Sequence, residues 1–191
     1  MKSDYPNSAG PVRVLCAANA AYAMPLCVML VSLLVNFARC REIEIYVLAT
    51  NIPEVDRRKI ETSLRRNRPD FDLRSLHWLS PDLKVFENIY LDRWGQVEVF
   101  VRLLAPHVLP ENWDKVLYLD SDMVILSDIS PLYDLANDES AVHAVRDETV
   151  EFVSGDFGVF NYAELGIPPK TPYFNSGVLL INLRYWRKHR V

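Results

Sequence analysis

Two carboxylates separated by one serine, Asp120-Ser121-Asp122, are the residues of this sequence whose spacing most clearly suggests chemistry. They directly follow the apolar run 116–119, which is long enough for one buried strand. Asp is a poor strand former, so the triplet marks the carboxyl end of that strand. On an extended backbone residues i and i+2 lie on the same side, and adjacent carboxylates repel unless a cation, a proton or water relieves them. The pattern indicates a divalent-metal site; a solvated turn with two exposed acids is the alternative.

The composition is typical of one compact soluble domain. Of the 191 residues 50% are hydrophobic, which is enough for a sizeable core. The net charge of −4, with basic residues interspersed among acidic ones, offers no general footprint for nucleic acid. Cys16, Cys27 and Cys40 form no C-x-x-C pair and are all predicted to be reduced thiols in apolar surroundings.

The amino-terminal residues 1–11 are expected to be disordered or flexible, and residues 12–191 to form a single domain. The polar start does not resemble a signal peptide. The most apolar run, 26–35, is far shorter than the ~20 residues of a membrane span, so no transmembrane segment is expected. A cytoplasmic protein is the default expectation.

Apolar, β-branched segments alternate along the chain with segments of helical periodicity. Strands are predicted at residues 12–18, 42–50, 72–79, 116–119, 141–145 and 178–183. Helices are predicted at residues 26–39, 53–66 and 97–109, and from 184 onward, where the chain is expected to stop inside a helix. This alternation indicates an α/β fold with a mostly parallel sheet and helices on both faces, a nucleotide-binding type of architecture. Because neither G-x-G-x-x-G nor a Walker A sequence is present, any phosphates must be held in another way.

Other polar residues allow two interpretations each. Arg102 stands inside an apolar helical pattern, where it could extend past the core to the surface or point into a ligand cleft. Asp147 is a further acid that follows a predicted strand. The residues His77, His107 and His143 match no ligand motif and are expected to be core or surface histidines.

Two longer segments resemble the signatures of the family 8 glycosyltransferases, which include bacterial lipopolysaccharide galactosyl- and glucosyltransferases and glycogenin. Residues 115–124 with the D-x-D triplet, followed by 128–132, are similar to the first signature. Residues 174–183 (FNSGVLLINL), then Trp186, are similar to the second. The first strand and the segment around Arg102 also occur in family order, so the resemblance covers roughly residues 12–190.

The resemblance implies a GT-A type fold, a Rossmann-like mixed and mostly parallel sheet flanked by helices, that binds a UDP-sugar. It implies that Asp120 and Asp122 hold Mn²⁺ or Mg²⁺, which suit hard oxygen ligands and stabilise charge that builds on the departing UDP. By the same resemblance Tyr22 is positioned to stack on uracil. The residues that match donor-binding positions of the family are Ala18, Asn19, Tyr22, Arg102, Asp120, Ser121, Asp122, Asp147 and Asn175.

The chain departs from the family pattern in two places. Many members carry Asp where this chain has Asn19, followed by a polar residue where it has Ala20 and Ala21. The uracil and ribose contacts are therefore expected to be weaker or to be made through backbone groups. The later acidic motif and a downstream His that serves as third metal ligand have no counterpart, since His189 comes too early. We therefore expect a carboxyl-terminally incomplete domain, catalytic residues beyond Val191, and a fragment that binds metal weakly and is itself inactive.

The function predicted from the resemblance is a retaining, metal-dependent transfer of a hexose from UDP-glucose or UDP-galactose to a glycan or lipid-linked, lipopolysaccharide-type acceptor. Acceptor specificity is expected in the loops around residues 148–173. Two alternatives stay open: a degenerate domain that binds a sugar nucleotide without activity, and a sugar-phosphate nucleotidyltransferase. The second would require a Gly-rich, basic loop after the first strand, which residues 17–21 do not provide.

Overall fold

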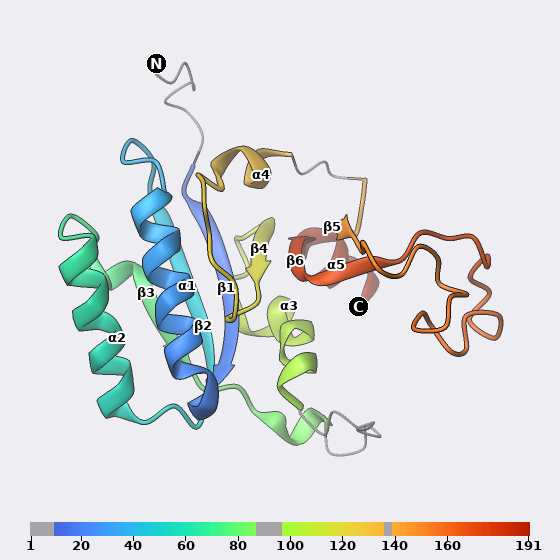
Figure 1. The fold of residues 1–191 in the computed structure, drawn as a ribbon, viewed down its shortest axis with the longest axis horizontal. Helices are drawn as coiled ribbons and strands as arrows, with labels where there is room; N and C mark the ends of the chain where they lie inside the picture. The colour runs from blue at the N-terminus through green and yellow to red at the C-terminus, as the bar shows by residue number, and fades with distance from the viewer. Residues whose placement is uncertain (1–9, 87–96, 136–138) are drawn as a thin grey trace.

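A computed structural model describes residues 10–86, 97–135 and 139–191 (Figure 1). The strands are β1 (Val12–Asn19), β2 (Ile43–Thr50), β3 (Leu76–Leu79), β4 (Lys115–Leu119), β5 (Val142–Arg146) and β6 (Phe174–Asn182). The α-helices are α1 (Ala23–Asn36), α2 (Glu54–Asn67), α3 (Ala105–Val108), α4 (Ser130–Asp134) and α5 (Leu183–His189). Short 3₁₀ helices are η1 (Ala20–Tyr22), η2 (Leu73–Ser75), η3 (Leu83–Phe86) and η4 (Val97–Leu104).

The six strands form one sheet in the order β3-β2-β1-β4-β6-β5. Strands β3, β2, β1 and β4 run parallel, whereas β6 runs antiparallel to both of its neighbours. Strand β1 pairs with β2 along all eight of its residues, but with β4 only at Val14 and Leu15. The predicted mixed, mostly parallel sheet flanked by helices is therefore confirmed.

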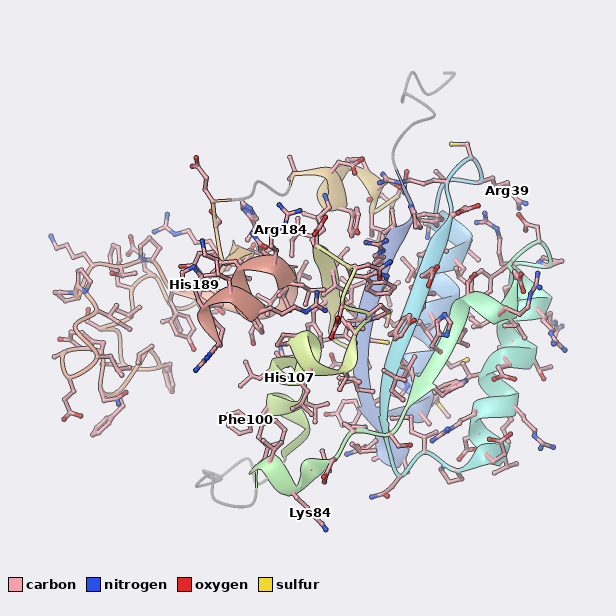
Figure 2. The ribbon with its side chains drawn as sticks, turned by 180° about the vertical axis from the view of Figure 1, so that it is seen from behind. Arg39, Lys84, Phe100, His107, Arg184 and His189 are labelled. Atoms are coloured by element: carbon pink, nitrogen blue, oxygen red, sulfur yellow. The ribbon has the colours of Figure 1, made fainter. Side chains whose placement is uncertain are left out.

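Helices cover both faces of the sheet, as the continuous apolar runs of the central strands require. On one face α1 and α2 pack over a core cluster that includes Leu117 and Leu119 of β4 (Figure 1). On the other face η4, α3 and α5 lie against a second cluster that includes Val116 and Tyr118 (Figure 2). Successive residues of β4 thus point into different cores.

Several elements differ from the prediction in extent or type. The single helix expected at 97–109 is instead the 3₁₀ helix η4 followed by one turn of α-helix, because Pro106 cannot continue a helix and instead stands at the start of α3. The strand expected from residue 72 begins at Leu76, since the Asp72 side chain accepts a hydrogen bond from the backbone N–H of Arg74 and caps η2.

Two further expectations are wrong. Helix α5 does not run to the end of the chain: Arg190 adopts a left-handed conformation (φ 54°), and its N–H donates to the carbonyl oxygen of Trp186. Such a residue terminates a helix. Cys40 is exposed and does not lie in the apolar surroundings predicted for it. Cys16 is buried and Cys27 is half-buried.

The expectation for the first nine residues lies outside the described part of the chain, and the single-domain division stays a prediction. Within the described ranges no helix has the length and apolar character needed to cross a membrane.

A buried arginine ties α1 to the segment after α2. The Arg68 guanidinium donates to the carbonyl oxygens of Leu34 and Phe37, at 3.0 Å for Phe37, where the end of α1 leaves carbonyl groups without helical partners. It also pairs with the Asp70 carboxylate at 3.0 Å. Arg39 contacts the same carboxylate from the surface, with 73% of its side chain exposed.

We expect Arg68→Met to lower the free energy of unfolding by about 2 kcal/mol, because buried carbonyl groups lose a charged donor. Chemical denaturation monitored by circular dichroism measures the change. Arg39→Met is the matched control, and its effect should be much smaller, because exposed ion pairs contribute little. Equal effects of the two substitutions would show that burial of Arg68 is unimportant.

Candidate functional site

The carboxyl ends of β1 and β4 form a crevice in the middle of the sheet. Their pairing stops at Leu15 and Tyr118, and past that point β1 and β4 no longer pair with each other. The chain leaves β1 toward β2 on one side, while β4 lies on the other, so this is the point where the strand order reverses. Open α/β sheets bind ligands at such switch points, outside the carboxyl ends of the strands.

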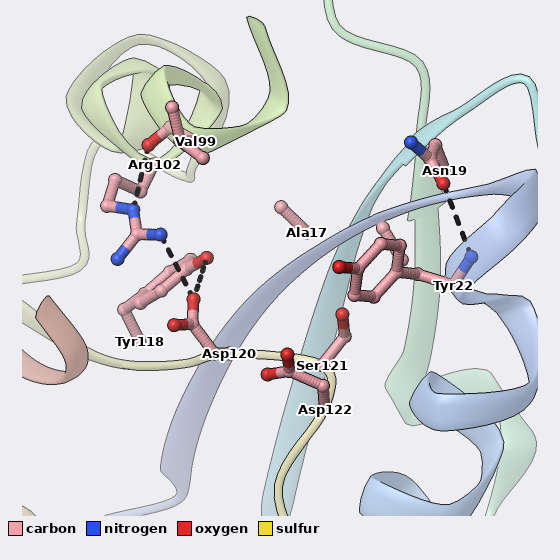
Figure 3. A pocket seen from close by; sticks show the side chains of 10 residues that line it. Ala17, Asn19, Tyr22, Val99, Arg102, Tyr118, Asp120, Ser121 and Asp122 are labelled. Carbon is pink, nitrogen blue, oxygen red and sulfur yellow. Dashed lines mark hydrogen bonds and ion pairs between the residues drawn. The ribbon is translucent and has the colours of Figure 1, made fainter. Parts of the chain in front are cut away.

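An open cavity of about 130 Å³ occupies this crevice (Figure 3). Because ligand pockets usually measure about 300–1,000 Å³, it can enclose only part of a drug-sized molecule. The residues that line it are Ala17, Ala18, Asn19, Tyr22, Val99, Arg102, Tyr118, Asp120, Ser121 and Asp122. Seven of the nine residues predicted to bind a donor are among them, brought together from the ends of two strands, from η1 and from η4.

The end of β1 presents Tyr22 to the cavity. The Asn19 side-chain oxygen accepts hydrogen bonds from the backbone N–H groups of Ala21 (3.0 Å) and Tyr22 (3.2 Å). An asparagine is a preferred cap at such a position, and here it fixes the first turn after the strand. The Tyr22 ring consequently points from η1 into the cavity (Figure 3).

On the opposite wall Arg102, Tyr118 and Asp120 form one connected group. Oδ1 of Asp120 accepts a hydrogen bond from Arg102 Nη2 at 3.0 Å and another from the Tyr118 hydroxyl at 2.8 Å. The Arg102 guanidinium lies 4.4 Å from the centre of the Tyr118 ring, and it also donates to the carbonyl oxygens of Val99 and Ser176. Only 11% of the Arg102 side chain is exposed. Arg102 therefore points into the cleft instead of extending to the surface.

Burial raises the pKa of the Tyr118 hydroxyl above its ordinary value. The group therefore stays protonated at neutral pH and acts as a donor to the carboxylate.

The two acids of the triplet do not lie side by side on an extended strand. Strand β4 ends at Leu119, and Ser121 and Asp122 form a turn. Residues i and i+2 share a side only on an extended backbone, so the expected same-side placement of Asp120 and Asp122 is wrong. Tyr118 and Asp120, two residues apart at the strand end, do share a side. Both carboxylates nevertheless line the cavity (Figure 3).

The donor chemistry of these carboxylates fits Mg²⁺ or Mn²⁺, which prefer oxygen ligands. Among the described residues no hydrogen bond or ion pair reaches Oδ2 of Asp120, and the Asp122 side chain is exposed. No group of three or more His, Cys, Asp or Glu side chains lies close enough to hold a metal in the part of the chain that the structure describes. The pair can therefore supply part of a coordination shell.

Strand β6, which carries Asn175, lies beside the triplet. The backbone N–H of Asp120 donates to the carbonyl oxygen of Gly177 at 2.8 Å, and the Gly177 N–H donates to the Asn175 side-chain oxygen at 2.8 Å. A Cβ at Gly177 would lie 2.9 Å from Oδ2 of Asp120 and 3.0 Å from the Asn175 oxygen. A side chain at this position would therefore displace the Asp120 carboxylate.

Asp147 and Asn175 lie next to the cavity and not among its lining residues. Asp147 follows β5, as the sequence predicted. Its Oδ1 accepts hydrogen bonds from the Thr149 hydroxyl (2.7 Å) and from the N–H groups of Thr149 (2.8 Å) and Val150 (2.9 Å). These contacts, the hydroxyl first, hold the pKa of Asp147 below its ordinary value.

Sequence reasoning gave no role to Tyr118 or Gly177. The signal for Tyr118 was present, since a residue two positions before Asp120 shares its side of the strand. No comparable signal marked Gly177, because its neighbour Asp120 lies far away in the sequence.

Comparison with known proteins identifies the family. A family model described as Glycosyl transferase family 8 matches residues 13–191. The chain belongs to glycosyl transferase family 8. General stress protein A of Bacillus subtilis (strain 168) is 29% identical over 182 residues, which cover 94% of this chain and 59% of that protein. Glycosyltransferase GlyF of Streptococcus pneumoniae is 26% identical over 182 residues, covering 93% of this chain and 38% of that protein.

The solved structures agree with this assignment. The galactosyltransferase LgtC, solved in complex with donor and acceptor sugar analogs, superposes with a TM-score of 0.76 at 29% identity. The match covers 93% of this chain and 60% of LgtC. The family 8 chain thus has the predicted GT-A type fold, and it spans about 60% of the length of General stress protein A and LgtC.

We expect Thr149→Val to raise the pKa of Asp147 toward its ordinary value, because the strongest hydrogen bond to the ionised form is lost. Carboxyl-carbon NMR titration measures it. Thr62→Val, which removes a hydroxyl bonded to a carbonyl on α2, should leave the pKa of Asp147 unchanged.

Since the folded pKa of Asp147 lies below the unfolded one, the contribution of Asp147 to stability is present above the unfolded pKa and disappears as the pH falls through the folded pKa. An unchanged pKa in Thr149→Val would contradict the assignment of its cause.

Proposed function

We propose that this family 8 chain carries the donor site of a retaining glycosyltransferase that moves a hexose from UDP-glucose or UDP-galactose to an acceptor. One observation carries the proposal: the crevice at the switch point gathers an aromatic ring, an arginine and two carboxylates from separate segments, Tyr22, Arg102, Asp120 and Asp122. The likeness to LgtC, whose structure holds donor and acceptor sugar analogs, supports it. Because this chain covers 60% of the length of LgtC, the transfer activity of the whole protein also belongs to the proposal.

In this proposal the nucleoside binds at the end of β1. The Tyr22 ring stacks on uracil, and Ala18 and Asn19 contribute contacts from the strand end. The Asn19 oxygen is already engaged in capping η1, so this residue serves to orient Tyr22 as well. A carboxamide caps the turn as well as a carboxylate does, which makes the departure from the family pattern compatible with donor binding.

The diphosphate binds at the end of β4. Asp120 and Asp122 hold Mn²⁺ or Mg²⁺, with Ser121 between them, and the bound cation supplies a positive charge that stabilises the departing UDP. Arg102 contributes a second positive charge on the same wall, 3.0 Å from Asp120. Asp147 and Asn175, just outside the cavity, face the donor sugar.

The acceptor in this proposal is a glycan or a lipid-linked sugar. The segment 148–173 between β5 and β6 extends away from the sheet (Figure 1) and is proposed to contribute acceptor specificity. The cytoplasmic location stays a prediction. Of the two alternatives, membership of family 8 gives no support to a sugar-phosphate nucleotidyltransferase.

The experiment that tests the proposal is calorimetric titration of the chain with UDP, with and without Mn²⁺. We expect binding that depends on Mn²⁺, and we expect Asp120→Asn to weaken it at least about tenfold. Loss of residues that merely orient a metal ligand already costs about 10–100-fold, so loss of a ligand should cost no less.

Asp114→Asn is the matched control, because Asp114 precedes the other end of the same strand and pairs with exposed Arg184 at 3.0 Å. It should bind UDP like the unaltered chain. UDP binding that ignores Mn²⁺, or equal weakening by both substitutions, would count against the metal site. Hydrolysis or transfer of UDP-galactose or UDP-glucose by a longer protein that includes this chain would exclude the degenerate binding domain.

A further inference from the structure

We propose that Tyr118 is a positioning residue for metal binding, which sets the orientation of the Asp120 carboxylate through its hydroxyl group. The inference rests on the proposed function and adds a residue to it. Tyr118 lines the cavity beside the predicted ligands, although its side chain belongs mainly to the core beneath α3 and α5. Because the Tyr118 ring is fixed in the core and its hydroxyl reaches the cavity, the residue can hold the Asp120 carboxylate in one orientation.

The hydroxyl engages one oxygen of the carboxylate. Tyr118 Oη lies 2.8 Å from Oδ1 of Asp120, and Arg102 Nη2 lies 3.0 Å from the same atom. In the described ranges Oδ2 takes part in no hydrogen bond or ion pair. Two donors on Oδ1 therefore fix the rotation of the carboxylate and turn Oδ2 away from them.

The space beside Oδ2 is kept open by glycine. A Cβ on Gly177 would approach Oδ2 to 2.9 Å, closer than a carbon contact allows. The carboxylate is thus held at Oδ1 by two donors, and no side chain of residue 177 crowds Oδ2. This is the arrangement in which neighbouring hydrogen bonds orient a metal-ligating carboxylate.

The Tyr118 ring is itself fixed. Only 2% of the residue is exposed, and the Arg102 guanidinium covers the ring at 4.4 Å from its centre. Replacement by phenylalanine keeps the ring, its burial and the contact with Arg102, and removes only the hydroxyl. Tyr118→Phe consequently isolates the proposed positioning role from packing.

The test is calorimetric titration of Tyr118→Phe with UDP at a series of MnCl₂ concentrations. We expect the Mn²⁺ concentration for half-maximal UDP binding to rise about tenfold, as for other residues that orient a metal ligand. The affinity for UDP at saturating Mn²⁺ should stay within about twofold of the unaltered chain, because no contact with the nucleotide is removed. A purely structural role would instead lower the thermal midpoint and leave the Mn²⁺ dependence unchanged.

Tyr133→Phe is the control, because Tyr133 is also buried and its hydroxyl donates to the Lys115 carbonyl oxygen, at the amino end of β4. It should leave the Mn²⁺ dependence unaltered. An unchanged Mn²⁺ dependence in Tyr118→Phe, or an equal shift in Tyr133→Phe, would overturn the inference while Mn²⁺-dependent UDP binding still upheld the proposed function. Failure of the unaltered chain to bind UDP with Mn²⁺ would refute the proposed function, and the inference with it.

Discussion

Strand β1 remains paired with β2 along eight residues but with β4 along two, and the whole candidate site depends on this difference. Where β1 and β4 separate, the residues at and after the strand ends line a cavity in the middle of the sheet and not at its edge. Helices on both faces hold the two strands at this separation. A binding site for a flexible, charged ligand benefits from such a rigid framework, because the polar groups of the protein are already in place before the ligand binds.

Charge compensation in the crevice is arranged before any ligand binds. Asp120 would be unfavourable beside a buried core without a partner, and Arg102 and the Tyr118 hydroxyl relieve it through the same oxygen atom. The Arg102 guanidinium is in turn held by two carbonyl oxygens and the face of an aromatic ring. The proposed donor diphosphate and cation would therefore enter a site in which the charge of Asp120 is already compensated and its orientation is set by the core.

Much of the fold follows from local patterns in the sequence. Apolar, β-branched runs and helical periodicity located each strand and most helices, because burial on one or two faces leaves a readable pattern. The pattern could not show that β6 lies antiparallel between β4 and β5, since strand order depends on contacts between distant residues. Nor could it distinguish the 3₁₀ helix η4 from an α-helix, or show that Arg190 ends α5, since both depend on local backbone geometry.

The site was predictable only in part for the same reason. The acids at the end of β4 were visible as a triplet, and the family resemblance added Tyr22, Arg102 and Asn175. The period of two along a strand does not hold for Asp120 and Asp122, where a turn interrupts the strand, but it does hold for Tyr118 and Asp120. The space at Gly177 exists because β6 passes within van der Waals distance of Asp120, and no local signal encodes that approach.

The central claim is that the carboxylates at the end of β4 bind the cation that holds a nucleotide diphosphate. Anomalous diffraction from crystals grown with MnCl₂ and UDP tests it most directly, because manganese can be located without reference to the protein density. The account predicts one anomalous peak between Asp120 and Asp122, in contact with the diphosphate and on the Oδ2 side of Asp120. UDP bound in the crevice with no manganese at these carboxylates, or manganese bound elsewhere on the chain, would contradict it.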